Sequence, residues 1–131
     1  MVYNPAARAR HLFVEALVQA IEPIDLDQEE CVFTPRTPLT ADITMHMPRP
    51  QNHFQRNRPR VDAFLRPEAV NMDYIRTPDV DNLAKFVLDG MQGVVYTNDS
   101  YITCLRSRKV YDNVGQCNGR TTVVVTRNEI V

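Results

Sequence analysis

The sequence predicts an α+β domain, in which two main helices pack on a small mixed or antiparallel sheet. Three patterns lead to this prediction: two segments with apolar residues at helical spacing, one segment that alternates, and two later strand-like segments. Their order is helix, strand, loop, helix, strand, strand, and the chain has no internal repeat. Elements in this order favour a sheet with helices packed on it.

The composition is that of a globular protein. The 131 residues fit a single domain over 1–131, and an apolar content of 44% is enough for an ordinary core. The net charge of −1 gives by itself no reason to expect a nucleic-acid partner. No segment has the character of a signal peptide or a membrane span. We therefore expect an intracellular, soluble protein with no membrane partner.

Several chemistries are disfavoured. Three cysteines without C-x-x-C spacing argue against a disulfide framework and a zinc site. His46 and His53 lack a partner at short spacing, which disfavours a metal role for either. With only 4 glycines and no G-x-S-x-G sequence, the chain offers neither a phosphate loop nor a serine-hydrolase motif.

The first helix is predicted from Ala6 to Ile21. Asn4 and Pro5 supply an N-cap followed by proline at the first helical position, and apolar residues then recur at helical spacing. Pro23 ends the helix because proline cannot continue the backbone hydrogen bonds. A short strand is expected next, at Cys31–Phe33.

Three further strands are predicted. Residues 39–47 alternate, which is the period of a half-buried strand, and the apolar side carries Leu39, Ala41, Ile43, Met45 and Met47. Residues 101–111 form the second strand. The β-branched run at 120–126 predicts a buried strand that pairs antiparallel to the one before it.

A basic segment at about residues 48–66 follows the first of these strands. It has no helical or strand period, and Asp62 is its only acid. It is either a solvated surface loop or a mobile basic arm that follows a phosphate backbone, and Phe54 within it is a candidate for contact with DNA. The residues assigned to DNA binding, here and in later basic stretches, are Arg49, Arg56, Arg58, Arg60, Arg76, Arg108 and Lys109.

The second helix is predicted over Asp79 to Gln92, where apolar residues recur three and four apart. Asp81, Lys85 and Asp89 are spaced by four and so stack along one side. One interpretation is structural, because acids favour a helix N-terminus and pair with lysine four residues on.

Asp99 favours a catalytic interpretation. A strand running back beside the second helix would bring Asp99 toward Asp79 and Asp81. Three converging carboxylates repel one another unless they share a cation, and oxygen ligands suit Mg²⁺, with Mn²⁺ as the alternative. Such a site activates water for attack on a phosphodiester, and Lys85 is suited either to hold the scissile phosphate or to steady the hydroxide.

The residues from 79 to 102 contain the motif Asp-x-Asp-Asn-x-x-Lys followed by a third Asp. This pattern closely resembles the RusA family of Holliday-junction resolvases. The resemblance implies a RusA-like fold and a homodimeric, magnesium-dependent endodeoxyribonuclease that cuts four-way or branched DNA by paired symmetric nicks. It assigns Asp79, Asp81 and Asp99 to metal binding, Lys85 to a catalytic role and Asp89 to a supporting one.

Two positions depart from the pattern. Many members have an acid where this chain has Asn98, and some have a basic residue where it has Pro78. Two alternatives therefore accompany the junction resolvase. One is a non-catalytic protein that binds junctions or other branched DNA, and the other is a nuclease for other branched DNA.

Overall fold

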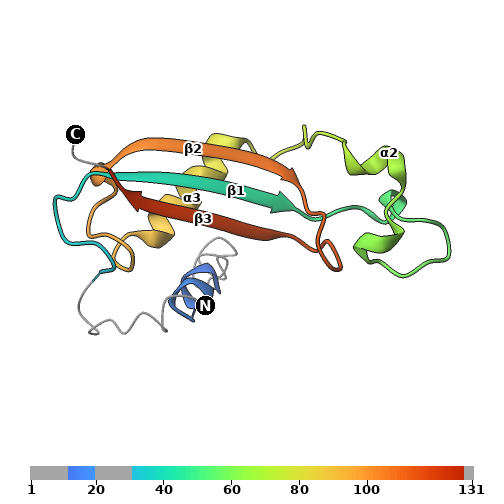
Figure 1. Ribbon diagram of the computed structural model, residues 1–131, viewed down its shortest axis with the longest axis horizontal. Helices are drawn as coiled ribbons and strands as arrows, with labels where there is room; N and C mark the ends of the chain where they lie inside the picture. Colours follow the sequence, from blue (N-terminus) through green and yellow to red (C-terminus); the bar gives the residue numbers. More distant parts are fainter. Residues whose placement is uncertain (1–11, 20–30, 129–131) are drawn as a thin grey trace, which may run out of the picture. The chain divides into compact units, whose positions relative to one another are not determined.

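A computed structural model describes residues 12–19 and 31–128 (Figure 1). Three strands form one sheet in the order β2-β1-β3, where β1 spans Leu39–Met47, β2 spans Ile102–Tyr111 and β3 spans Arg120–Arg127. The arrows in Figure 1 show that β1 and β2 run in the same direction and β3 in the opposite one. The sheet is therefore mixed and the fold α+β, as predicted.

β1 is the central and most buried strand. Leu39, Ala41, Ile43 and Met45 are at most 3% exposed, as their alternation predicts, whereas Met47 at the end of the predicted apolar side is only half-buried. Most residues of β2 and β3 are exposed or half-buried. A strand that is paired along both edges and covered on one face has the clearest alternating pattern. The bounds of β1 were therefore predicted more accurately than those of the other strands.

The predicted pairing of the last two strands was wrong. β3 pairs with β1 rather than with β2, and it is largely exposed rather than buried. The parallel pairing of β1 with β2 leaves the other edge of β1 open. The loop after β2 is held at the end of β1, because the Asp112 N–H donates to the Met47 carbonyl over 2.7 Å and the Arg49 N–H donates to the Cys117 carbonyl over 3.0 Å. β3 takes that edge. Just past its end, the Asn128 N–H donates to the Pro38 carbonyl over 2.9 Å.

The main helix, α3, spans Val80–Met91, which agrees with the helix predicted over 79–92. No helix among the described residues is long and apolar enough to cross a membrane. Four short helical segments were not predicted: α2 at Pro67–Val70, and the 3₁₀ turns η2 at Gln51–His53, η3 at Asp62–Phe64 and η4 at Asp99–Tyr101.

Residues 12–19 are helical, in agreement with the first predicted helix. The Phe13 ring packs against Phe86 of α3, with 5.6 Å between ring centroids. Gly90 makes room for it, because a Cβ there would lie 2.5 Å from two Phe13 ring atoms. The remainder of this predicted helix, with its cap at Asn4 and Pro5 and the stop at Pro23, lies outside the described residues.

The strand expected at Cys31–Phe33 was wrong, because these residues form a bend. Val32 and Phe33 nevertheless donate N–H hydrogen bonds to the carbonyls of Val94 and Val95, over 3.2 and 3.0 Å. Their partner is a turn with no regular ladder to extend, so no strand results.

The chain forms two compact units. Among the described residues, unit 1 contains residues 12–19, 31–40, 84–104 and 126–128, and unit 2 contains residues 41–83 and 105–125. The buried apolar residues of unit 1 include Leu39, Ala84, Val87, Met91, Val95 and Tyr96. Those of unit 2 include Ala41, Ile43, Met45, Phe54, Ala69, Tyr111 and Cys117.

Candidate active site

The first predicted site residues lie where α3 begins. Asp79 directly precedes the helix, and its backbone carbonyl accepts a hydrogen bond from the Leu83 N–H over 3.1 Å. Asp81 lies in the first turn. The side chains of Asp79, Asp81 and Lys85 are exposed, whereas the buried residues of the helix are Ala84, Val87, Gly90 and Met91. The amphipathic pattern thus directs the charged residues to solvent.

The charged side chains at the start of α3 form no capping hydrogen bond and no ion pair in the described part of the chain. Neither Asp79 nor Asp81 accepts a hydrogen bond from a first-turn N–H in the described part of the chain, as a capping carboxylate would. Asp81 and Lys85, although four residues apart, form no ion pair there either. The structural interpretation from the sequence required both kinds of contact. Two carboxylates and an ammonium group therefore remain available to a ligand.

A tight turn, rather than a strand, follows α3. The N–H groups of Val94 and Val95 both donate to the Met91 carbonyl, over 3.1 and 2.8 Å, and Gly93 donates to the Tyr96 carbonyl over 2.7 Å. Gly93 has a φ of 89°, which glycine adopts without steric cost. The expected strand running back beside the helix was therefore wrong.

Asp99 begins the short turn η4 and is exposed. Its N–H donates to Oε1 of Gln92 over 3.3 Å, so its backbone lies beside the residue that follows α3. The Asn98 side chain accepts a hydrogen bond from the Ser100 N–H over 2.9 Å. Asn98, which departs from the resolvase pattern, therefore acts here as the cap of η4.

Tyr96 lies close to two of the predicted acids. It is 1% exposed, and its hydroxyl donates to the Leu88 carbonyl over 2.7 Å. Burial raises the pKa of Tyr96, and the carboxylates of Asp99 and Asp89 raise it further. The structure thus brings the predicted third ligand and the predicted supporting acid to the surroundings of one hydroxyl group.

The donors predicted for the metal are all carboxylate oxygens, which suit Mg²⁺ and Mn²⁺. Among residues 12–19 and 31–128, no three His, Cys, Asp or Glu side chains form a group that could hold a metal ion. Asp79 and Asp81 belong to unit 2, and Asp99 belongs to unit 1. The donor chemistry fits the ion, and the joint ligation by Asp79, Asp81 and Asp99 stays a prediction.

The basic segment is folded rather than an extended mobile arm. The Gln55 N–H donates to the Phe64 carbonyl over 2.8 Å, and the Arg66 N–H donates to the His53 carbonyl over 2.9 Å. Phe54 is only 1% exposed. Its ring belongs to the core of unit 2 and is not available to DNA, contrary to the sequence-based expectation. A loop without a periodic pattern gave no sign of this burial.

The predicted DNA-binding arginines differ in exposure. Arg56, Arg58, Arg76 and Arg108 are exposed. Arg60 is half-buried, with its guanidinium 4.8 Å from the Phe54 ring centroid and a 2.9 Å hydrogen bond to the Arg49 carbonyl. The exposed members are therefore the ones that can reach a phosphate directly.

Arg49 lies beneath the surface, at 2% exposure. Its guanidinium stacks 4.9 Å from the Tyr111 ring centroid, and burial lowers its pKa. All of its hydrogen-bond acceptors are neutral: the carbonyls of Asp112, Ala69 and Val70, the Asn113 side-chain oxygen and the His53 Nδ1. Because its N–H groups donate to these acceptors, the Arg49 guanidinium holds several segments of unit 2 together and does not lie on the predicted DNA-binding surface.

Lys109 is tied to the segment that leads into α3. Its ammonium donates to the carbonyls of Arg76 and Pro78, over 2.6 and 3.0 Å, and lies 5.3 Å from the Tyr74 ring centroid. These contacts indicate that Lys109 positions the segment before α3, which is an alternative to the predicted role in DNA binding.

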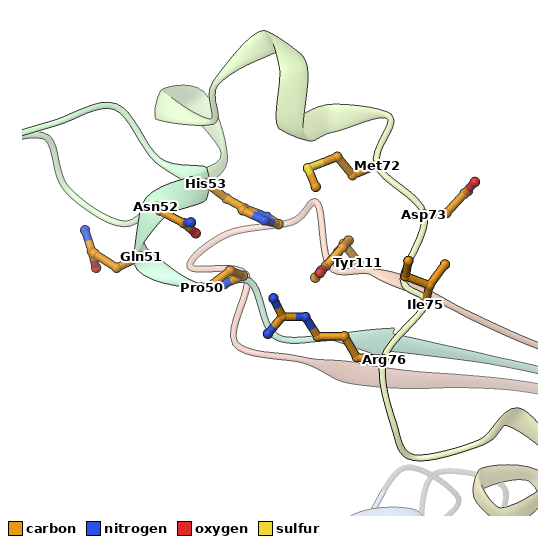
Figure 2. A pocket seen from close by; sticks show the side chains of 9 residues that line it. All are labelled: Pro50, Gln51, Asn52, His53, Met72, Asp73, Ile75, Arg76 and Tyr111. Carbon is orange, nitrogen blue, oxygen red and sulfur yellow. The ribbon is translucent and has the colours of Figure 1, made fainter.

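Sequence reasoning missed a cavity of about 500 Å³ in unit 2 (Figure 2). Its walls come from the segment before and within η2, the segment after α2, and the end of β2. They include His53, Arg76 and Tyr111. Residues so far apart in the sequence share no local pattern, so only tertiary structure reveals that they line one space.

Comparison with known proteins adds one finding. A family model described as "Endodeoxyribonuclease RusA" matches residues 13–126, which is most of the chain. The matched range contains the whole acidic motif, the lysine and the basic segment. Searches of curated proteins and of solved structures gave no match.

Proposed function

The chain belongs to the RusA family of endodeoxyribonucleases, and we propose that it is a magnesium-dependent enzyme that resolves Holliday junctions. The reaction is phosphodiester hydrolysis in four-way DNA by paired symmetric nicks. Two nicks related by symmetry require two equivalent sites, so the active form is a homodimer. Mn²⁺ is an alternative to Mg²⁺ because both prefer oxygen ligands.

The observation that carries the proposal is a set of uncommitted charges in the family motif. Asp79, Asp81 and Lys85 are exposed at the start of α3 and pair with no described residue. Acids that served only as helix caps would have their oxygens filled by N–H groups of the first turn. Free carboxylates beside a free ammonium group support catalysis on a phosphate instead.

The residue roles follow from charge. We assign Asp79, Asp81 and Asp99 as the metal ligands, and a bound divalent ion supplies an activated water and charge stabilisation. The Lys85 ammonium donates to an oxygen of the scissile phosphate, where negative charge develops. We assign Asp89 a supporting role on the family pattern alone. The exposed arginines bring the DNA to this acidic centre by neutralising its phosphates.

The test is a cleavage assay on a labelled four-way junction with Mg²⁺. Asp81→Asn keeps the shape and removes the charge, so we expect cleavage to fall by roughly 100-fold or more while binding is retained. Glu68→Gln in α2 is the matched control, because Glu68 is exposed and lies outside the motif.

Absence of nicking by the unmodified protein, with either Mg²⁺ or Mn²⁺, would sink the catalytic proposal. Junction binding without nicking would then identify a non-catalytic binding protein. Flaps and replication forks, assayed in parallel, separate a junction resolvase from a nuclease for other branched DNA.

A further inference from the structure

The cavity in unit 2 offers a hydrogen-bond donor that the protein itself leaves unused. Nδ1 of His53 lies 3.1 Å from Nη1 of Arg49. Arginine nitrogens only donate, so Nδ1 accepts and the proton of the neutral imidazole is on Nε2. Burial lowers the pKa of His53, and Arg49 and Arg76 lower it further, which keeps the ring neutral.

The Nε2–H of His53 makes no hydrogen bond among the described residues, and the His53 ring packs edge-on against Tyr111 with 4.8 Å between ring centroids. No fully buried side-chain nitrogen or oxygen there lacks a hydrogen bond, so this donor is open to the cavity instead of sealed in the core. Figure 2 shows the imidazole pointing into the space that the labelled residues enclose. The tautomer that Arg49 selects thus presents one N–H group to a ligand.

The charges around this cavity favour an anion. Arg49 contacts His53 and has only neutral hydrogen-bond acceptors, and the carboxylate that acts on its charge, Asp112, is itself paired with Arg120. Arg76 lines the cavity and reaches back toward Pro50, whereas the Asp73 carboxylate points away (Figure 2). Arg49 and Arg76 place two positive charges next to the cavity, which raises the local concentration of anionic ligands there.

The size of the cavity indicates more than a simple ion. Its volume of about 500 Å³ lies within the range of roughly 300–1,000 Å³ typical of sites for small organic ligands. Asn52 adds an amide group that both donates and accepts hydrogen bonds, whereas the Gln51 amide points away from the cavity (Figure 2). A nucleotide combines an anionic phosphate with sugar and base atoms that such an amide can bind.

We propose that this cavity binds one nucleotide of a DNA strand, with its phosphate held by the His53 Nε2–H and the Arg76 guanidinium. The assignment of this nucleotide to a DNA strand rests on the proposed function. Arg76 and Asp79 lie on one short segment, whose backbone Lys109 holds at Arg76 and Pro78. A nucleotide anchored here is held on the approach to the first predicted metal ligand.

The test for the phosphate contact uses binding alone, in an Asp81→Asn background that is expected to cut no DNA. Single neutral methylphosphonates are placed at successive positions around the branch of a four-way junction, and each Kd is measured with and without Arg76→Gln. At one position we expect the methylphosphonate to weaken binding roughly 3- to 10-fold with Arg76 present and to have no further effect with Arg76→Gln. Arg127→Gln, an exposed arginine of β3 outside the proposed site, is the control and leaves the methylphosphonate effect intact.

Equal methylphosphonate losses with and without Arg76→Gln at every position would overturn the phosphate assignment. The role of His53 is tested by His53→Gln, which keeps an N–H donor, against His53→Phe, which does not. Thermal unfolding first confirms that both variants fold. Binding retained by the glutamine variant and lost by the phenylalanine variant is the expected result, and equal losses would remove His53 as a donor.

A third measurement tests the cavity without branched DNA. Titration of the full chain with thymidine 5′-monophosphate should shift the side-chain amide NMR signals of Asn52, and inorganic phosphate should shift them less. Equal responses to both would leave an anion site and refute the nucleotide assignment. Because no cleavage is measured, a failed nuclease assay leaves this proposal standing, and a successful one does not rescue it.

Discussion

A single buried carboxylate, Asp112, closes the loop between β2 and β3. It is 3% exposed and accepts hydrogen bonds from the N–H groups of Val114 and Gly119, over 3.1 and 3.0 Å, and from Nε of Arg120 over 3.3 Å. Burial alone would raise the pKa of Asp112, but these donors outweigh burial and lower it. The ionised form of Asp112 is therefore the form that stabilises the folded loop.

Asp112→Asn should lower the free energy of unfolding by about 2 kcal/mol at pH 7, because hydrogen bonds to a charged group contribute roughly 1.5–3 kcal/mol. The folded pKa is lowered, so the stabilisation is present above the unfolded pKa of about 3.9 and is lost as the pH falls through the folded value. Denaturant unfolding of both proteins at pH 7 and pH 3 measures this. The free energies of unfolding of the unmodified protein and of Asp112→Asn should differ less at pH 3 than at pH 7. An equal difference at both pH values would contradict a stabilising role for the Asp112 charge.

At the scale of elements, the segment before α3 is held by side chains from its surroundings. The Tyr74 hydroxyl donates to the Thr77 carbonyl over 2.9 Å, and the Tyr74 ring packs edge-on against Tyr111 with 5.0 Å between centroids. Lys109 of β2 binds two further carbonyls in this segment. Asp79 follows immediately, so its position depends on these contacts.

Lys109→Met keeps the apolar stem and removes the ammonium that binds the Arg76 and Pro78 carbonyls. We expect the Mg²⁺ concentration for half-maximal cleavage to rise roughly 10-fold, as for residues that orient metal ligands. The dependence of binding on salt should stay unchanged, since no phosphate contact is lost. Lys109→Arg, which retains donors, should recover part of the loss.

If Lys109 contacts DNA directly, the result differs. The slope of log binding constant against log salt would then fall by about 1, because one fewer phosphate is neutralised. An unchanged Mg²⁺ requirement together with such a reduced slope would refute the positioning role and restore the role expected from the sequence.

At the scale of the whole molecule, a net charge of −1 hides an uneven distribution. Acids gather at α3 and η4, whereas Arg56 and Arg58 lie exposed in the basic segment. A nuclease with an acidic centre needs cations elsewhere on its surface, because the substrate is a polyanion.

Replacing both exposed arginines, Arg56→Ala with Arg58→Ala, should weaken junction binding and reduce the salt slope by about 2, one for each phosphate contact. Single-turnover cleavage at saturating protein should persist, since neither residue belongs to the acidic site. Arg127→Ala serves as the control for loss of an exposed positive charge. An unchanged slope in the double variant would remove the basic segment from the DNA surface.

The sequence by itself determined the elements whose signal is local. β1 and α3 were located closely because apolar residues repeat at the period of a strand or a helix that buries one face. The Asp79, Asp81 and Lys85 pattern also lies within adjacent turns of one helix. Its resemblance to the RusA family was confirmed by the match over residues 13–126.

Tertiary structure alone decided what depends on distant partners. β3 pairs with β1 because the loop before it is hydrogen-bonded to the end of β1, which no property of residues 120–127 reveals. Phe54 and Arg49 are buried in a segment whose composition looks solvated. The segment folds back so that Leu65 pairs with Phe54, and Arg49 finds its acceptors at Ala69 and Asp112, elsewhere in unit 2. The cavity at His53 likewise joins segments that are far apart in the chain. Periodicity reports which face of an element is buried, and edge pairing and loop burial follow only from the surroundings that the fold supplies.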